Sequence, residues 1–431
     1  MNRIYVLSLP LLMVLVSMTF KPTNAQENWT RFRGPNGTGL SDSKTIPTKW
    51  TKDDYLWRTK LKGVGVSSPV VWKGKSFVTS GDHSSATLHL QCFSSAGKEL
   101  WSKSFESKTY KLHRANSYAA STPAVDSDHV YIMLANPEQT LMIALDHDGN
   151  EKWRRDFGKW VCSHGFGTSP ILHKDMVIFC NLQKGDEKLR EGQSPGRSRI
   201  TAVNRLTGKD VWETPVTTKL TGYSVPCIFE SNGNDQLIGC NLGDGFFSLD
   251  PDTGKKNWSK NVFRLRSVSS VLVSGEMVYG SNGSGGGGNF LVAISPGQST
   301  DEPVFEFAQA ANYVPTAIAI GELLFLFGDR GVVSCLDKKT GAKHWQKRVS
   351  KKGFYGSPVA TKTDIYVVDA SGEAIVLKAS KEFAITSKIS LEEESHATPA
   401  IAGDRIYFRT QQHLICLGEK ENSAAKNSNR E

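Results

Sequence analysis

The chain has 431 residues, of which 39 are glycine, and a formal net charge of +9. Helical periodicity is nearly absent, whereas runs of β-branched and aromatic residues bounded by Gly, Asn, Asp and Pro recur throughout. This composition is typical of an all-β protein. The lysines are scattered over turns and not gathered in one strip, which favours a solvated basic surface and argues against a nucleic-acid partner.

Residues 1–25 have the pattern of an export signal. Arg3 supplies the positive start, Ile4–Phe20 is apolar, and small residues precede a cleavage position after Ala25. The alternative is a membrane anchor, but the apolar stretch is interrupted by Ser8 and Pro10 and is short for a helix that needs about 20 apolar residues to span a bilayer. The sequence therefore predicts a secreted or periplasmic protein without a membrane span.

Residues 26–54 follow the signal. Their first part, residues 28–39, is too rich in Gly and Pro for regular structure, yet it carries two aromatic residues, Trp29 and Phe32, that can fix it against a larger body. We expect this segment to cross one face of the molecule as a strap. The next stretch, Tyr55–Leu61, has the pattern of the outer strand Glu99–Phe105 of a later unit, but no inner strands precede it.

One pattern, Leu-Asp-turn-Gly-x-x-x-Trp, recurs along the chain with the glycine four residues before the tryptophan. The glycine of each copy lies between two apolar runs, so we expect a hairpin turn with φ > 0 there, and the tryptophan should begin a strand whose large side chain is buried. The glycine and tryptophan of the five copies are Gly97 and Trp101, Gly149 and Trp153, Gly208 and Trp212, Gly254 and Trp258, and Gly341 and Trp345.

A second marker shares this period: a Ser/Thr-Pro or related step followed by an apolar run. Successive steps lie 41 to 56 residues apart, which matches the roughly 40–50 residues of one four-stranded propeller blade. A large β-sandwich is the alternative, but it has no reason to reuse both markers in one order. Residues 55–418 are therefore predicted to form an eight-bladed β-propeller. The anchors of the eight units are Pro69, Pro123, Pro170, Pro226, Val271, Ala317, Pro358 and Pro399.

The last unit supplies three strands, near residues 399–401, 406–409 and 414–417, and then stops. Because Tyr55–Leu61 is a spare outer strand, we expect it to pair with this last unit and close the ring, which removes two exposed sheet edges. The polar tail 419–431 is predicted to be disordered. The glycine-rich insertion 282–289 has no phosphate-loop lysine and is interpreted as a flexible loop.

The residues just before the anchors should ring one mouth of the central channel, which is the usual ligand site of a propeller. Two interpretations stay open. The tyrosines plug the channel and the charges pair with one another, or Arg266 and the two histidines bind a small anionic or sugar-like ligand on which the tyrosines stack. The candidate ligand-binding residues are His164, Tyr223, Arg266, Asn312, Tyr355, Glu394 and His396.

The same mouth offers little for metal binding or catalysis. Glu394, with Asp82 or Asp329 beside it, is the only nominated carboxylate, whereas a calcium site needs several. The seven cysteines show no metal-ligand spacing, and no bridge is assigned among them. We find no hydrolase motif and assign no catalytic residue and no metal ligand.

The repeat resembles the PQQ-like repeat of eight-bladed quinoprotein propellers. Within that superfamily, the segments 33–37, 113–119 and 164–170 are similar to those of secreted bacterial single-propeller proteins. The resemblance covers almost the whole mature chain and implies that the Gly and Trp residues hold neighbouring blades together. It leads to two branches, the PQQ-dependent alcohol dehydrogenases and non-enzymatic scaffolds such as the propeller subunit of the outer-membrane β-barrel assembly machine.

This chain departs from both branches. It lacks the adjacent Cys-Cys pair of the dehydrogenases, it has no C-x-x-C-H haem motif, and no lipid-anchoring Cys stands at the predicted cleavage site. The preferred prediction is an exported, monomeric, non-enzymatic binding or scaffold module whose partner is a protein or an envelope polymer, with no cofactor assigned. The alternative is an oxidoreductase that uses PQQ with calcium and acts on alcohols or sugars.

Overall fold

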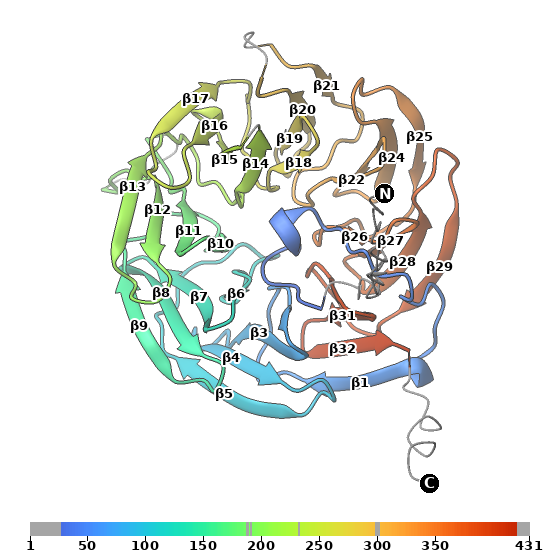
Figure 1. Ribbon diagram of the computed structural model, residues 1–431, viewed down its shortest axis with the longest axis horizontal. Helices are drawn as coiled ribbons and strands as arrows, with labels where there is room; N and C mark the ends of the chain where they lie inside the picture. Colours follow the sequence, from blue (N-terminus) through green and yellow to red (C-terminus); the bar gives the residue numbers. More distant parts are fainter. Residues whose placement is uncertain (1–26, 187–188, 190–191, 232, 298–301, 420–431) are drawn as a thin grey trace, which may run out of the picture.

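The computed structural model describes residues 27–186, 189, 192–231, 233–297 and 302–419. In this part of the chain, eight four-stranded antiparallel sheets surround a central channel (Figure 1). The prediction of an all-β, eight-bladed propeller is confirmed. The predicted signal peptide and the tail from residue 420 onward lie outside the described residues.

The strands of each blade run in chain order from the channel to the rim, except in the eighth blade. The first four blades are β2 (Val70–Trp72), β3 (Lys75–Gly81), β4 (Leu88–Phe93) and β5 (Glu99–Phe105); β6 (Ala124–Val125), β7 (His129–Asn136), β8 (Gln139–Asp146) and β9 (Glu151–Asp156); β10 (Ile171–His173), β11 (Met176–Asn181), β12 (Arg199–Asn204) and β13 (Asp210–Pro215); and β14 (Cys227–Ser231), β15 (Asn234–Asn241), β16 (Gly245–Leu249) and β17 (Lys256–Lys260).

The remaining four blades are β18 (Leu272–Ser274), β19 (Met277–Asn282), β20 (Phe290–Ile294) and β21 (Phe305–Phe307); β22 (Ile318–Ile320), β23 (Leu323–Phe327), β24 (Val332–Asp337) and β25 (Lys343–Arg348); β26 (Val359–Ala360), β27 (Asp364–Val368), β28 (Glu373–Lys378) and β29 (Ile385–Ser390); and β30 (Ala400–Ala402), β31 (Arg405–Arg409), β32 (His413–Gly418) and β1 (Tyr55–Lys60).

The predicted ring closure is confirmed, because β1 pairs antiparallel with β32 and Thr59 lies opposite Leu414. The middle strands are largely buried on both faces, and all eight residues of β7 are buried between neighbouring blades. The outer strands alternate instead: in β9 only Trp153 is buried, and the other side chains are exposed or half-buried. The core therefore lies between blades, and the tryptophan of the repeat seals its outer edge.

Trp153 shows how the repeat joins one blade to the next. Its indole Nε1 donates to the Arg205 carbonyl of the third blade at 3.0 Å. Its ring lies so close to Gly208 that a Cβ there would approach Cε3 to 2.7 Å. Equivalent contacts join Trp57 to Ser95 and Gly97, Trp101 to His147 and Gly149, and Trp212 to Pro251 and Gly254.

All five repeat glycines have φ between +67° and +86°, so the predicted turn conformation is confirmed. The fifth blade lacks the Gly-x-x-x-Trp hairpin, and Phe305 on β21 takes the place of the tryptophan against Gly341 of the sixth blade. The cysteines that precede the repeat are buried core residues: Cys92 lies opposite Trp101 and Cys335 lies opposite Trp345. All seven thiols are free.

The innermost strands are held in a ring by the Ser and Thr residues of the anchors. The backbone N–H of Thr316, for example, donates to the Ser357 hydroxyl of the next blade at 2.9 Å. The residue immediately before each anchor is Ser or Thr, except in the fourth unit, where it is Val225, which has no hydroxyl. Six such bonds of 2.8–3.1 Å join Ser68 to Thr122, Thr122 to Ser169, Val225 to Ser270, Ser270 to Thr316, Thr316 to Ser357, and Ser357 to Thr398.

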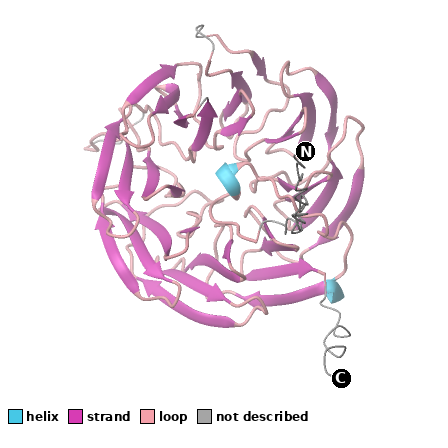
Figure 2. Cartoon of the chain, viewed as in Figure 1, coloured by secondary structure: helices cyan, strands magenta, loops and turns pink. Residues whose placement is uncertain are grey.

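Residues 27–54 cross one mouth of the channel, and the short 3-10 helix η1 (Pro35–Gly37) lies at the centre of the ring (Figure 2). The buried Arg31 donates to the Pro226 carbonyl of the fourth blade at 2.9 Å. The buried Arg33 donates to the Ala317 carbonyl of the sixth blade at 2.9 Å. The segment thus ties the fourth and sixth blades together at this mouth.

Candidate functional site

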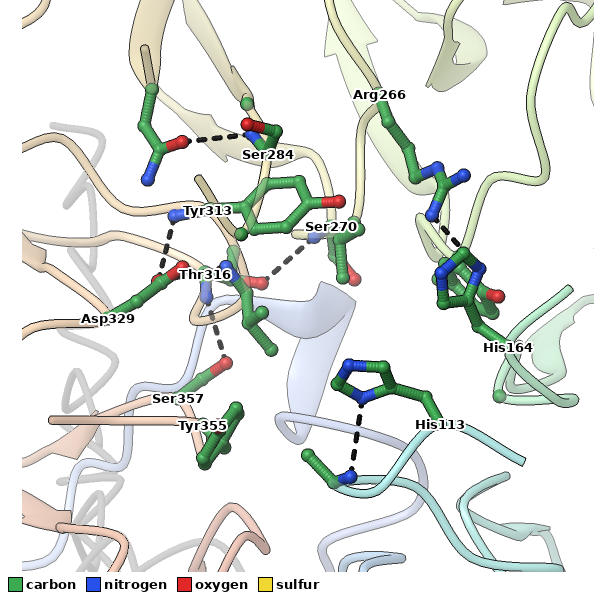
Figure 3. Close-up of a pocket in the computed structure, with 18 of the residues that line it drawn as sticks. His113, His164, Arg266, Ser270, Ser284, Tyr313, Thr316, Asp329, Tyr355 and Ser357 are labelled. Atoms are coloured by element: carbon green, nitrogen blue, oxygen red, sulfur yellow. Dashed lines mark hydrogen bonds between the residues drawn. The ribbon is translucent and has the colours of Figure 1, made fainter. Parts of the chain in front are cut away.

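A cavity of about 1300 Å³ occupies the channel at the mouth opposite the strap. The anchor residues and the loops that precede them form its walls, and Phe32 of the strap lies at its floor. Figure 3 shows side chains from several blades pointing into this space. The channel therefore forms a cavity that is open at one mouth and crossed by the strap at the other.

The structure brings five of the seven predicted ligand-binding residues together in the lining: His164, Tyr223, Arg266, Tyr355 and His396. The other two do not line the cavity. Asn312 is fully buried and its Nδ2 donates to the Pro315 carbonyl at 2.6 Å, so its side chain closes its own loop. Glu394 is exposed and lies outside the lining.

Arg266 and His164 form the best-defined contact of the site. Arg266 Nη1 lies 3.2 Å from His164 Nδ1 (Figure 3). A guanidinium can only donate, so His164 Nδ1 must accept and the ring must be neutral with its proton on Nε2. Burial is the largest of the effects that together lower the pKa of His164 to about 4, and the charges of Arg266, His113 and Lys184 act in the same direction. At neutral pH, His164 therefore presents an Nε2–H donor.

His113 and Asn116 belong to the site but were not among the predicted residues. His113 Nδ1 accepts the Ala115 N–H at 3.2 Å, and the His113 and His164 ring centres lie 5.6 Å apart. Asn116 Nδ2 donates to the His164 carbonyl at 2.8 Å and so holds that loop in place. Both residues lie further before their anchor than the positions that sequence reasoning considered, although they fall within the segment 113–119 that resembles the secreted propellers.

Basic side chains outnumber acidic ones in the lining, which the scattered lysines of the sequence did not predict. Asp329 is the only carboxylate in the described part of the lining. It accepts the N–H groups of Tyr313 and Val314 at 3.0 and 3.1 Å, and burial raises its pKa. The basic residues that sequence reasoning missed come from loops and strand ends outside the few positions before the anchors that it considered: Arg114, Lys184, Arg264, Arg330 and Arg348.

The tyrosines line the walls of the cavity and do not close it. The Tyr355 and His396 rings lie 4.3 Å apart, and the Tyr223 hydroxyl lies 3.2 Å from Cys162 Sγ. Burial raises the pKa of both Tyr223 and Tyr313, so both phenols are neutral at physiological pH. These tyrosines offer aromatic surface and hydrogen-bonding hydroxyls around a cavity whose charged side chains are mostly basic.

The residues present do not form a calcium site of the kind that a quinone dehydrogenase requires. Within the described residues, no group of three or more His, Cys, Asp or Glu side chains is arranged to hold a metal ion. Asp329 alone supplies a carboxylate to the lining, whereas Ca²⁺ takes six to eight oxygen ligands. The basic and aromatic walls suit an anionic group, but the donor set does not fit the metal.

The closed ring of eight blades and its axial cavity define a single eight-bladed β-propeller. A profile of the family described as "Outer membrane protein assembly factor BamB" matches residues 86–347 and 329–426, and the chain belongs to this family. No curated protein matches the sequence. Across residues 27–186, 192–231, 233–297 and 302–419, no helix is long and apolar enough to cross a membrane.

Solved structures of both branches share the fold. BamB from Moraxella catarrhalis is 15% identical with a TM-score of 0.60, and the alignment covers 85% of this chain and 98% of that protein. The quinohemoprotein alcohol dehydrogenase from Comamonas testosteroni is 14% identical with a TM-score of 0.65, and the alignment covers 92% of this chain and 81% of that protein. Both similarities concern the fold alone.

Proposed function

We propose that this chain is an exported, non-enzymatic propeller of the cell envelope that binds a protein partner at the open mouth of its cavity. The observation that carries the proposal is the large, basic cavity with the strap at its floor. Its volume of about 1300 Å³ exceeds the roughly 300–1,000 Å³ of typical small-molecule sites. Membership of a family named for an outer-membrane assembly factor supports a protein partner.

The alternative is a PQQ-dependent oxidoreductase that acts on alcohols or sugars. The likeness in fold to alcohol dehydrogenases favours it, and the basic, aromatic walls suit a planar anionic cofactor. When bound, PQQ would supply the two-electron acceptor. Arg266 is the residue best placed to bind an anionic group of such a cofactor, but the described residues lack a carboxylate set for the calcium ion.

A capture experiment that compares matched variants tests the proposal. Arg330 and Arg348 are exposed at the mouth, and Arg154 is on the outer strand β9 of the second blade. The wild type and an Arg154→Glu control should capture the same protein from an envelope extract, and an Arg330→Glu/Arg348→Glu variant should lose it because two positive charges at the mouth become negative.

Three results would contradict the proposal. Capture that survives protease digestion of the extract would indicate an envelope polymer. Equal capture by all three variants would place the partner away from the mouth. Thermal stabilisation by PQQ with calcium, together with dye-linked oxidation of an alcohol, would favour the oxidoreductase.

A further inference from the structure

Within the described part of the chain, the wall that Arg266 and His164 form offers hydrogen-bond donors and no carboxylate that pairs with Arg266. The Arg266 backbone is fixed because its carbonyl accepts the Gly283 N–H at 2.9 Å. Its side chain donates to His164 Nδ1, and its Nε is buried without a hydrogen-bond partner in the described structure. His164 Nε2–H is also left to donate, because Nδ1 accepts. Arg266 and His164 come from different blades and both line the cavity, and the His164 Nε2–H points away from the side of the ring that contacts Arg266.

The surrounding charges leave this wall electropositive. Lys184 is buried in the lining, and His113 lies on the same side of the cavity (Figure 3). Arg264 differs from Arg266 because Glu306 pairs with its guanidinium at 2.9 and 3.2 Å. No carboxylate lies within ion-pair distance of Arg266 among the described residues. An arginine without an internal counter-ion in a low-dielectric wall favours binding of an oxyanion.

The shape of the cavity favours a chain segment over a small ion. Its volume of about 1300 Å³ far exceeds what one carboxylate needs. Residues 283–288 form part of the wall, and four of the five lining residues in this stretch are glycine. Such a wall leaves room for a polypeptide backbone to approach closely, and Tyr223 and Tyr313 add aromatic surface nearby.

We propose that the cavity receives an acidic segment of the protein partner and that Arg266 and His164 Nε2–H bind carboxylates of this segment. The inference rests on the proposed function, because it names the chemistry by which the partner enters the same site. It predicts that the partner carries Asp or Glu residues in an extended segment or at its C-terminus.

Direct binding to an acidic peptide tests this inference. A short polyglutamate peptide should bind the full-length wild-type protein, and Arg266→Gln should weaken binding about 10- to 100-fold, because hydrogen bonds to charged groups are strong. Arg154→Gln removes the same charge from the outer strand β9 and should leave binding unchanged. Inorganic phosphate serves as the second probe: if phosphate binds at Arg266 and the peptide does not, the peptide part of the inference is wrong.

A second measurement uses the unmodified protein and does not depend on how the variants fold. Imidazole NMR should show His164 with its proton on Nε2 and a low pKa in the free protein. Bound carboxylate would favour the protonated ring, so the peptide should raise the pKa of His164. The groups that face this ring are Arg266, His113 and Lys184, and all three are positively charged or can become so. An unchanged His164 pKa in the peptide complex would contradict the inference.

The two proposals can fail separately. If the partner is captured at the mouth but Arg266→Gln captures it as well as the wild type, the carboxylate site is wrong and the binding role stands. If the polyglutamate peptide binds at Arg266 but no envelope protein is captured, the anion chemistry stands and the protein-binding function fails.

Discussion

Replacement of Gly208 by alanine tests whether the repeat glycines act through contact between blades. Gly208 has φ +67°, and an added Cβ would lie 2.7 Å from Trp153 Cε3 and 2.8 Å from Cδ2. The ring is poorly placed to move away, because it is largely buried and its Nε1 donates to the Arg205 carbonyl at 3.0 Å. The substitution therefore combines backbone strain with a steric clash at the junction of the second and third blades.

Gly275 is a matched control because it has φ +61° and no heavy atom within 4 Å of an added Cβ. The left-handed conformation should cost either alanine about 1–2 kcal/mol. Overpacking against Trp153 should add about 1–3 kcal/mol at Gly208 only. Urea unfolding followed by circular dichroism measures the difference in unfolding free energy between the two variants. Equal destabilisation by Gly208→Ala and Gly275→Ala would refute the role assigned to the tryptophan contact.

Two further predictions follow from burial and charge. Burial raises the pKa of Cys92 to about 12, and Cys162 is the only thiol that is not buried. A thiol reagent at pH 8 should therefore modify Cys162 alone in the folded protein. Rapid modification of several thiols would contradict the packing. Burial also tends to raise the pKa of Asp146, but hydrogen bonds from Asn150 and Lys152 outweigh it and hold the pKa below its usual value. The stability that this carboxylate contributes should thus be fully present at neutral pH and decrease progressively as the pH falls from about 4 toward the lowered pKa of the folded state. Asp146→Asn should therefore destabilise the protein at pH 7 and destabilise it less at pH 2, as measured by urea unfolding at each pH.

The fold could be predicted from the sequence because its signals are local and repeated. A glycine four residues before a tryptophan indicates a turn with positive φ and a buried indole ring, and the two residues pack against their counterparts in neighbouring blades. The spare strand expected at Tyr55–Leu61 and the incomplete last blade likewise predicted the closure that β1 and β32 make. The fifth blade shows the limit of the pattern, because Phe305 performs the packing role without the motif.

The cavity could be predicted only in part, because its lining comes from two kinds of position. Residues such as His164 and Arg266 lie just before the anchors, so their distance in sequence indicates their place at the mouth. Asn312 lies at a similar distance before its anchor, but its side chain donates to the Pro315 carbonyl of its own loop. The spacing in the sequence does not predict this side-chain orientation. Lys184 lies in the loop between β11 and β12, and Arg330 lies in the hairpin between β23 and β24. These residues line the cavity because the blades are arranged in a ring.

A crystal structure of the full-length protein with the polyglutamate peptide bound is the most direct test of the central claim that the cavity binds an acidic partner segment. The account predicts that the peptide enters the open mouth and that carboxylates of the peptide lie within hydrogen-bond distance of Arg266 and of His164 Nε2. A peptide bound on the outer strands, or in the cavity with its carboxylates directed away from both side chains, would contradict it.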